Sequence, residues 1–332
     1  MKAILSQVAG DPGTLVLADV PEPEPGPNDV LVAVKACGIN FPDGLLIRDK
    51  YQIRPPRPFA PGSEISGIVA RVGAAVSRFR PGQHVIGRLG WGGLAERVAV
   101  PEDRCIAIDA TMPFDQAAAF IFTYGTAHYA LVDRGHVAPG ETVLVLGASG
   151  GVGIAAVQAA KALGARVIAA ASSTERLAVA LANGAERGVV YPRTLTDKEA
   201  ARALAAEFKD ACGATGADVV LDPVGGPYAE PALRAIARNG RHLVVGFTAG
   251  IPAIPLNLPL LKSCSVVGVD WGAFVRGDPA GAAANAAAVL ALYGAGKLSP
   301  RVSERFTLAE APAAIARLES RAVTGKLVVM MD

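Results

Sequence analysis

The stretch TVLVLGASGGVGIAAVQAAKALGARVIAAASS (residues 142–173) joins two apolar runs through a glycine-rich turn and a helix-like segment. Its glycines follow the spacing GxxGxxG, from Gly147 to Gly153. Between a strand and a helix, such glycines let backbone amides approach a pyrophosphate at the positive N-terminus of the helix. The stretch therefore predicts a dinucleotide site, with a tight structural turn as the alternative. The residues expected to contact the dinucleotide are Ser149, Gly150, Gly151 and Val152.

The end of the second apolar run bears on which dinucleotide is bound. Sites for NAD usually carry Asp or Glu about 20 residues after the glycines, where the carboxylate binds the ribose hydroxyls. Here the run at 166–171 ends in Ser172 and Ser173, with Arg176 just beyond. Hydroxyls and a guanidinium would bind the extra phosphate of NADPH, which a carboxylate would repel. The sequence predicts NADPH, and a capping box of Ser172 and Glu175 would leave that prediction in place.

Composition narrows the class of protein. A length of 332 residues fits two domains better than one. No apolar run is long enough to cross a membrane, and the short apolar start does not resemble a signal peptide. A net charge of +2 gives no nucleic-acid signature. The four cysteines are scattered, as buried thiols in a reducing compartment would be, so we expect a cytoplasmic protein.

The order of apolar patterns divides the chain into regions. Short strand-like runs separated by Gly and Pro fill the first third and predict a compact β-rich domain. A helical pattern follows Pro113, and strands and helices alternate from 142 to 270, which predicts a parallel sheet with helices on both faces. The expected strands lie at 142–147, 166–171, 188–191, 217–222, 241–246 and 264–270, the expected helices at 151–163, 174–183, 197–211, 227–238, 279–294 and 308–320, and a last strand at GKLVVM.

An ordered series of motifs runs nearly from end to end of the chain. It comprises the opening KA, PGPNDVLVAVKACGINFPDG, PFAPGSEISGIV, FRPGQHVIG, TYGTAHYAL, GASGGVG, DPVGG and ESRAVTGKLVV. In this series the chain resembles the medium-chain dehydrogenase/reductases, in their quinone oxidoreductase (zeta-crystallin-like) branch. The resemblance implies an α/β fold with a Rossmann domain, built on a doubly wound parallel sheet, at 123–271. It implies a GroES-like β-rich catalytic domain that is discontinuous, at 1–122 and 272–332.

The resemblance also implies contacts with the cofactor beyond the glycine turn. Tyr191 corresponds to a residue beside the NADP phosphate. Positions near the nicotinamide, or at strand ends that face the cofactor, are Thr126, Tyr129, Val224, Gly225 and Phe247. For Val224 and Phe247, a plain position in the core is an equally good interpretation.

The alcohol dehydrogenases of the same superfamily hold a catalytic zinc with Cys and His. Where the resemblance places two of these ligands, this chain has Asn40 and Ser63. No cysteine lies in IFTYGTA, and the segment 87–96 is too short for the lobe that holds a structural zinc. Amide and hydroxyl groups are poor zinc ligands, so we expect no metal. Without a Lewis acid, a quinone or an α,β-unsaturated carbonyl is a better substrate than an alcohol.

Two residues are candidates for the chemistry. The Asn40 amide is suited to donate to a developing oxyanion, although an Asn in a turn is also a common structural residue. Tyr51 aligns with a proton donor of the family's enoyl thioester reductases, or it only packs in its loop. Basic residues surround it, and they form either a solvated loop or a site for an anionic acyl thioester. They are Arg48, Lys50, Arg54 and Arg57.

Three functions are therefore compatible with the sequence. The first is NADPH-dependent reduction of a quinone or enone, and the second is reduction of an enoyl or acrylyl thioester. The third is a non-enzymatic role as an NADPH-binding crystallin or RNA-binding protein, which the intact glycine turn and the absence of basic clusters disfavour. The run SCSVVGVD (residues 263–270) predicts an exposed sheet edge. In the family this edge joins two subunits, so we expect a homodimer.

Overall fold

The computed structural model of the chain describes residues 1–195 and 197–331. The chain folds into two compact units, and each is described by itself. The first unit combines residues 1–122 with the tail from Pro300, and the second is Thr123–Ser299. No helix of the described residues is long and apolar enough to cross a membrane.

The second unit is built on a parallel sheet of six strands in the order β10-β9-β8-β11-β12-β13. This order, with the first strand in the middle and the chain winding outward on both sides, is that of the Rossmann fold. The strands are β8 (Thr142–Val145), β9 (Arg166–Ala171), β10 (Arg187–Val190), β11 (Ala217–Asp222), β12 (Ile236–Val244) and β13 (Ser265–Gly268). β8, β9 and β11 are almost wholly buried, as expected of strands covered on both faces.

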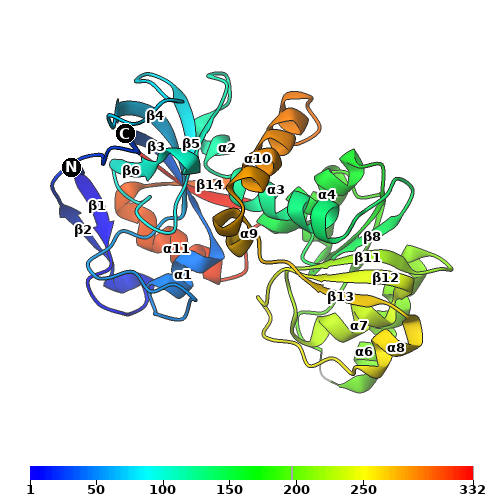
Figure 1. Ribbon diagram of the computed structural model, residues 1–332. Helices are drawn as coiled ribbons and strands as arrows, with labels where there is room; N and C mark the ends of the chain where they lie inside the picture. Colours follow the sequence, from blue (N-terminus) through cyan, green and yellow to red (C-terminus); the bar gives the residue numbers. More distant parts are fainter. Residues whose placement is uncertain (196, 332) are drawn as a thin grey trace. The chain divides into compact units, whose positions relative to one another are not determined.

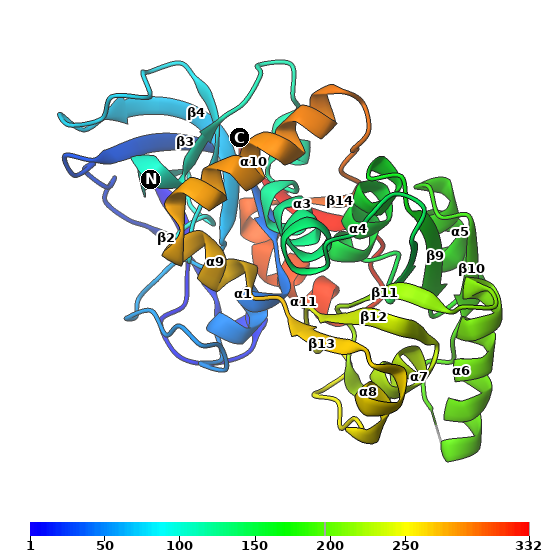
Figure 2. The same cartoon turned by 45° about the vertical axis from the view of Figure 1, so that its right-hand side comes forward.

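Helices cover both faces of this sheet. Figures 1 and 2 show α4 on one side and α7 with α8 on the other. The helices of this unit are α4 (Gly151–Ala162), α5 (Thr174–Ala182), α6 (Lys198–Cys212), α7 (Ala229–Arg234), α8 (Asn257–Lys262), α9 (Trp271–Gly277) and α10 (Pro279–Gly294). A further helix α3 (Ile121–His128) starts in the first unit and runs into the π-helical turn η3 (Tyr129–Arg134). The predicted doubly wound α/β fold is thus confirmed.

Two parts of this unit differ from the sequence-based expectation. The helix predicted at 227–238 ends at Arg234, because the chain already enters β12 at Ile236, which pairs with Ala217. Asn239 then takes a positive φ of 63°, which gives this strand an irregular start that its apolar pattern does not signal. The short helices α8 and α9 were not predicted.

The chain passes between the two units at 122/123 and again at 299/300. Residues 272–299, which the resemblance assigned to the catalytic domain, therefore lie with the second unit. Asn285 of α10 explains the difference, because its side chain accepts from Trp271 Nε1 at 3.2 Å and donates to Gly125 O at 3.3 Å. These buried hydrogen bonds tie α10 to α9 and α3.

The first unit is a β-rich fold around a mixed sheet with the order β14-β15-β3-β4-β5-β7, to which β6 adds by pairing with β3. The strands are β3 (Asp29–Ile39), β4 (Glu64–Val72), β5 (His84–Arg88), β6 (Arg97–Pro101), β7 (Cys105–Ala107), β14 (Val302–Thr307) and β15 (Lys326–Met330). β15 comes from the end of the chain and pairs antiparallel with β3, with Leu327 opposite Ile39. This pairing brings residue 326 beside residue 40. The helices are α1 (Phe41–Leu46), α2 (Phe114–Ala117) and α11 (Ala311–Glu319).

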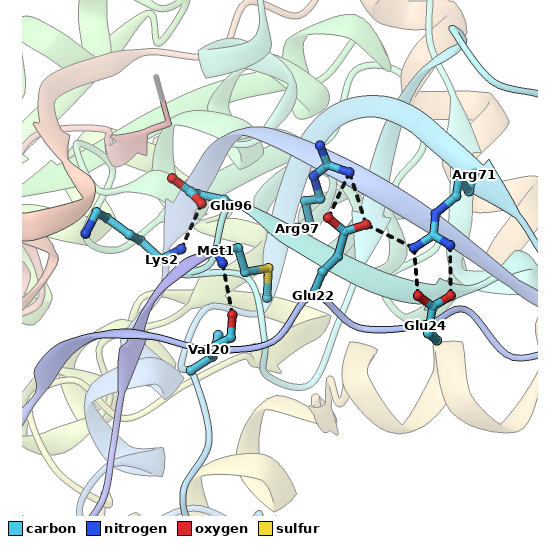
Figure 3. A network of polar contacts seen from close by, with 8 residues as sticks. All are labelled: Met1, Lys2, Val20, Glu22, Glu24, Arg71, Glu96 and Arg97. Atoms are coloured by element: carbon cyan, nitrogen blue, oxygen red, sulfur yellow. Dashed lines mark hydrogen bonds and ion pairs between the residues drawn. The ribbon is translucent and has the colours of Figure 1, made fainter.

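The proline-rich lead-in is held against this sheet by exposed ion pairs, shown in Figure 3. Before it, β1 (Lys2–Leu5) and β2 (Val16–Asp19) form a separate two-stranded ribbon. Arg71 of β4 binds Glu24 at 2.8 Å and Glu22 at 2.9 Å, and Arg97 of β6 also reaches Glu22. The lead-in is therefore fixed beside β4 and β6 although prolines keep it out of the sheet.

Candidate active site

The predicted glycine turn lies where expected in the second unit, between the end of β8 and the start of α4. Gly150 is the residue before the helix, and Gly147 takes a positive φ of 58°. A side chain at Gly153 would place its Cβ 2.1 Å from the carbonyl oxygen of Gly147, so only glycine lets helix and turn approach this closely. Ser149 is buried beside the turn. The first turn of α4 thus presents backbone amides at the carboxyl end of the sheet, the geometry that binds phosphates.

Arg176 reaches back from the next helix to this turn. Ser173 caps α5 by accepting from the backbone N–H of Arg176 at 3.3 Å, so the cap is Ser173 and not the predicted Ser172. A hydrogen bond from the hydroxyl of Ser173 lowers the pKa of Glu175. The Arg176 side chain extends the other way, with Nη1 donating to Ser149 Oγ at 3.3 Å. A guanidinium and a hydroxyl therefore meet beside the glycine turn.

Tyr191, which follows β10, completes this cluster. Its ring is buried against Tyr228 at a centroid distance of 4.8 Å. Burial raises the pKa of the phenol to about 12, against the effect of a hydrogen bond with the Gly147 backbone and of the nearby Arg176 charge. Because β8, β9 and β10 are neighbours in a parallel sheet, their carboxyl ends bring Ser149, Arg176 and Tyr191 together. We name these three residues the phosphate cluster.

The turn after β11 is held by a buried carboxylate that the sequence reading missed. Asp222 accepts from the backbone N–H groups of Val224 and Gly225, both at 2.8 Å, and His242 Nε2 lies 3.2 Å from its other oxygen. Val224 is buried in the core cluster of this unit, whereas Phe247 is 46% exposed. The sequence left both residues open between a cofactor contact and a core position. The core position fits Val224 better than Phe247.

The two residues expected near the nicotinamide lie on α3 and η3. Thr126 is buried. Tyr129 is partly exposed, and its ring stacks on Phe274 of α9 at 4.3 Å with an angle of 12° between the planes. One face of the Tyr129 ring is therefore covered by Phe274, a contact between residues too distant in sequence for the pattern to predict.

In the first unit, Asn40 lies at the junction of β3 and α1 and is nearly fully buried. Its backbone N–H donates to Asp43 Oδ2 at 2.7 Å, which starts the helix. Its side-chain oxygen accepts from Lys326 Nζ at 2.6 Å, and its amide nitrogen makes longer contacts of 3.3–3.4 Å with Gly38 O, Ser63 Oγ and Glu64 Oε2. Asn40 therefore has the structural role that the sequence offered as an alternative. Its side-chain amide is held most firmly through the oxygen.

Lys326 is a buried ammonium that the sequence reading did not single out. Its Nζ also donates to Ile39 O at 2.9 Å and lies 3.6 Å from Glu64 Oε2. The other oxygen of Glu64 accepts from the Phe122 backbone N–H at 2.8 Å, at the start of α3. Burial raises the pKa of Glu64 and lowers that of Lys326, and the attraction between the two opposes both changes. The feature of the sequence that could have revealed Lys326 is a lysine in the otherwise apolar strand KLVVM.

Asp43 adds a second buried carboxylate to this group. Burial raises its pKa to about 6, although hydrogen bonds from the backbone of Asn40 and Gly62 and the charge of Lys326 act in the opposite direction. Its Oδ1 finds no hydrogen-bond partner among the described residues, which leaves one oxygen for a proton. Asp43, Glu64 and Lys326, together with Asn40 and Ser63, form what we call the buried polar cluster.

Tyr51 is partly exposed in the irregular segment after α1. Two of the basic residues around it are committed to ion pairs: Arg48 binds Asp11 and Glu319, and Arg57 binds Asp49 at 2.8 Å. Lys50 and Arg54 are exposed.

Within the described ranges, no three His, Cys, Asp or Glu side chains gather in a group that could hold a metal ion.

Comparisons with known proteins agree with this architecture. The family model of the alcohol dehydrogenase GroES-like domain matches residues 26–110, and that of the zinc-binding dehydrogenases matches residues 151–288. The quinone oxidoreductase-like protein 2 homolog of Nematostella vectensis is 39% identical over 92% of this chain and 82% of its own length.

Two solved structures extend the comparison over the whole fold. A probable oxidoreductase from Mycobacterium abscessus matches with a TM-score of 0.87 and 36% identity, over 99% of both chains. A quinone oxidoreductase of Escherichia coli, solved in complex with NADPH, matches with a TM-score of 0.90 and 27% identity, over 99% of this chain and 100% of that one. The chain belongs to the quinone oxidoreductase family of the medium-chain dehydrogenase/reductases.

Proposed function

We propose that this oxidoreductase uses NADPH to reduce a quinone or an α,β-unsaturated carbonyl compound, without a metal. The observation that carries the proposal is the phosphate cluster. It puts a guanidinium, a hydroxyl and a phenol beside the glycine turn, and Ser172 and Ser173 follow β9 where an NAD site would have a carboxylate. The resemblance to a quinone oxidoreductase solved with NADPH supports the same cofactor.

Different residues of the second unit fit different parts of NADPH. The backbone of the turn at Ser149–Val152 and the N-terminus of α4 would hold the pyrophosphate. Arg176 and Tyr191, with Ser172 and Ser173, would hold the phosphate on the ribose. Thr126, Tyr129 and the turn at Val224–Gly225 would contact the rest of the cofactor, with Phe247 as an exposed apolar contact. Bound NADPH would supply the hydride for the reduction.

The buried polar cluster of the first unit supports a reaction without zinc. At the position that would carry a metal ligand, Asn40 turns its oxygen to the Lys326 ammonium, so a cation already lies there. A second cation bound at this place would be repelled by Lys326, and the amide and hydroxyl groups would hold it poorly. In this proposal Asn40 serves the polarisation of the acceptor's carbonyl oxygen, and Tyr51 or water delivers the proton.

The structure gives less support to an acyl thioester as the substrate. That alternative needs cationic side chains to meet an anionic substrate, yet Arg48 and Arg57 are neutralised by Asp11, Glu319 and Asp49. The two exposed cations, Lys50 and Arg54, are a weaker basis for recognising it.

The experiment that tests the proposal is NADPH oxidation by the purified protein against a panel of acceptors. The panel contains benzoquinone, naphthoquinone, 2-cyclohexenone, a 2-alkenal, acrylate and a crotonyl thioester. We expect turnover with quinones or enones, in the presence of a chelator as in its absence. Absence of turnover with every quinone and enone would refute the proposal, and turnover of the thioester alone would establish the alternative.

We further propose that the protein is a homodimer joined at the β13 edge. A band of exposed apolar side chains on α8, the segment before it and β13 supports this: Ile251 at 83%, Leu256 and Leu260 at 78%, Leu261 at 66% and Val266 at 42% exposure. Patches of this kind mark interfaces, and an open sheet edge can pair with its copy.

A further inference from the structure

The directions of the hydrogen bonds in the buried polar cluster follow from chemistry alone. A lysine ammonium only donates, so the atom of Asn40 that lies 2.6 Å from Lys326 Nζ must be the amide oxygen. This contact fixes the orientation of the amide group. The amide nitrogen consequently points to the opposite side, toward Gly38, Ser63 and Glu64.

The next link is the Ser63 hydroxyl. An amide NH2 can only donate, so Ser63 Oγ accepts from Asn40 at 3.4 Å and keeps its own hydrogen for another acceptor. The described residues provide no acceptor for that hydrogen. Ser63 is 7% exposed, so the residue is nearly but not wholly buried. A buried donor without an acceptor is costly, and a ligand oxygen would satisfy it.

The backbone on both sides of Ser63 is fixed. Asp43 holds the backbone N–H of Asn40 and lies close enough to that of Gly62 to be affected by it. Gly62 takes a φ of 96°, and a Cβ there would lie 2.7 Å from Cys37 Sγ, so the chain passes where only glycine fits. Ser63 O accepts from the Leu89 backbone N–H at 2.8 Å. The hydroxyl therefore projects from a rigid support, as a preorganised donor must.

We propose that the Ser63 hydroxyl is the catalytic residue that donates a hydrogen bond to the carbonyl oxygen of the acceptor. Lys326 and Asn40 act as positioning residues behind it. In the chain from ammonium to amide to hydroxyl, each donor polarises the next, which makes the terminal O–H a stronger donor. When the acceptor gains a hydride, negative charge develops on its carbonyl oxygen. The Ser63 hydroxyl stabilises that charge while keeping its own proton. The inference rests on the proposed reduction and names the residue that would bind the acceptor's carbonyl oxygen.

The test compares Ser63→Ala, Ser63→Thr and Ser66→Ala. Ser66 lies three residues further along, in β4, and is fully buried, but its hydroxyl donates to Phe114 O and not to the Asn40 group. We expect Ser63→Ala to lower kcat for the best quinone or enone by about 100-fold and to leave the Kd for NADPH within twofold. Ser63→Thr keeps the hydroxyl and should restore most of the rate, and Ser66→Ala should leave it unchanged.

A second measurement reports on the bond without turnover. The infrared carbonyl stretch of bound 2-cyclohexenone should lie at lower frequency in the wild type than in Ser63→Ala, because the hydrogen bond weakens the C=O bond. Lys326→Met should shift the stretch in the same direction as Ser63→Ala by a smaller amount, and Lys326→Arg should restore it. A merely structural Lys326 would not move this signal in folded protein.

The outcomes separate this inference from the proposed function. A wild type without turnover on any quinone or enone would refute the function itself. An active wild type whose rate and carbonyl stretch are unchanged in Ser63→Ala would overturn the role of Ser63 alone. If Ser63→Ala acts as expected but Lys326→Met leaves the stretch unchanged, the positioning role of Lys326 is wrong.

Discussion

At the scale of single residues, we propose that Arg176 decides the preference between NADPH and NADH. Its guanidinium lies 3.3 Å from Ser149 Oγ, beside the place proposed for the ribose phosphate. A hydrogen bond to a charged group contributes roughly 1.5–3 kcal/mol, or about tenfold to a hundredfold in affinity. Arg176→Ala should therefore raise the Kd for NADPH by about that factor and barely change that for NADH, as measured by fluorescence titration. An equal loss for both cofactors would show that Arg176 only supports the turn.

Asn40 links the two ends of the hydrogen-bonded chain, so removing its amide should affect the reaction more than cofactor binding. We expect Asn40→Ala to lower kcat by roughly tenfold or more and to change the Kd for NADPH much less. Steady-state kinetics and a binding titration on the same preparation measure both quantities. Equal turnover in variant and wild type would reduce Asn40 to its role at the start of α1.

The raised pKa of Asp43 predicts that the free energy of unfolding depends on pH. Burial raises its pKa from 3.8 to about 6, so between these values the folded state keeps a proton that the unfolded state has released. Stability must then fall as pH rises through this window, by about 3 kcal/mol in total, and level off above it. Urea unfolding of wild type and Asp43→Asn from pH 4 to pH 7 isolates this contribution, because Glu64 and Lys326 face the same cluster in both. Parallel profiles would contradict the raised pKa.

The phosphate cluster and the buried polar cluster differ in how far the sequence reveals them. Ser149, Arg176 and Tyr191 follow strands of one repeating pattern, so parallel pairing alone brings them together. Lys326 meets Asn40 across 286 positions of sequence, through a strand pairing that no local pattern specifies. The sequence accordingly indicated Asn40 as a candidate and Ser63 only as a position without a zinc ligand, and it did not indicate Lys326, Asp43 or Glu64.

At the scale of elements, strands were easier to place than the segments between them. β8, β9 and β11 each contain an apolar run of at least three residues and begin at the predicted residues. The helix predicted to reach residue 238 stops at Arg234, because pairing of Ile236 with Ala217 overrides the helical pattern. Tertiary pairing, which local propensity does not contain, decided this boundary.

The apolar band on α8 and β13 predicts the oligomeric state. Fully burying a Leu side chain contributes about 1.5–3 kcal/mol, so replacing two should raise the dimer Kd at least about 100-fold. We expect sedimentation of the wild type to give twice the mass of one 33.9 kDa chain. The double variant Leu260→Glu, Leu261→Glu should sediment as one chain.

Leu181→Glu, at a 40% exposed position on α5 outside this band, is the matched control and should stay dimeric. A wild type of one-chain mass at micromolar concentration would contradict the proposed homodimer.

At the scale of the whole molecule, we propose that the second unit binds the cofactor and that the first polarises the acceptor. The doubly wound sheet and the β-rich fold were both predictable, because the alternation of strands and helices differs so clearly between the two parts of the chain. The return crossing at 299/300 was not, because hydrogen bonds of Asn285 to Trp271 and Gly125 hold α10 in the second unit. Such side-chain contacts produce no periodic pattern in the sequence.

The most direct test of the proposed reaction follows the hydride itself. The wild type is supplied with the enone that it reduces fastest and, in turn, with the two forms of NADPH that carry deuterium on either face of C4. We expect one form to yield a product with a single deuterium on the carbon β to the carbonyl, and the other form to yield an unlabelled product. Mass spectrometry and NMR of the product distinguish the two. An unlabelled product from both forms would contradict direct transfer from NADPH, and with it the central claim.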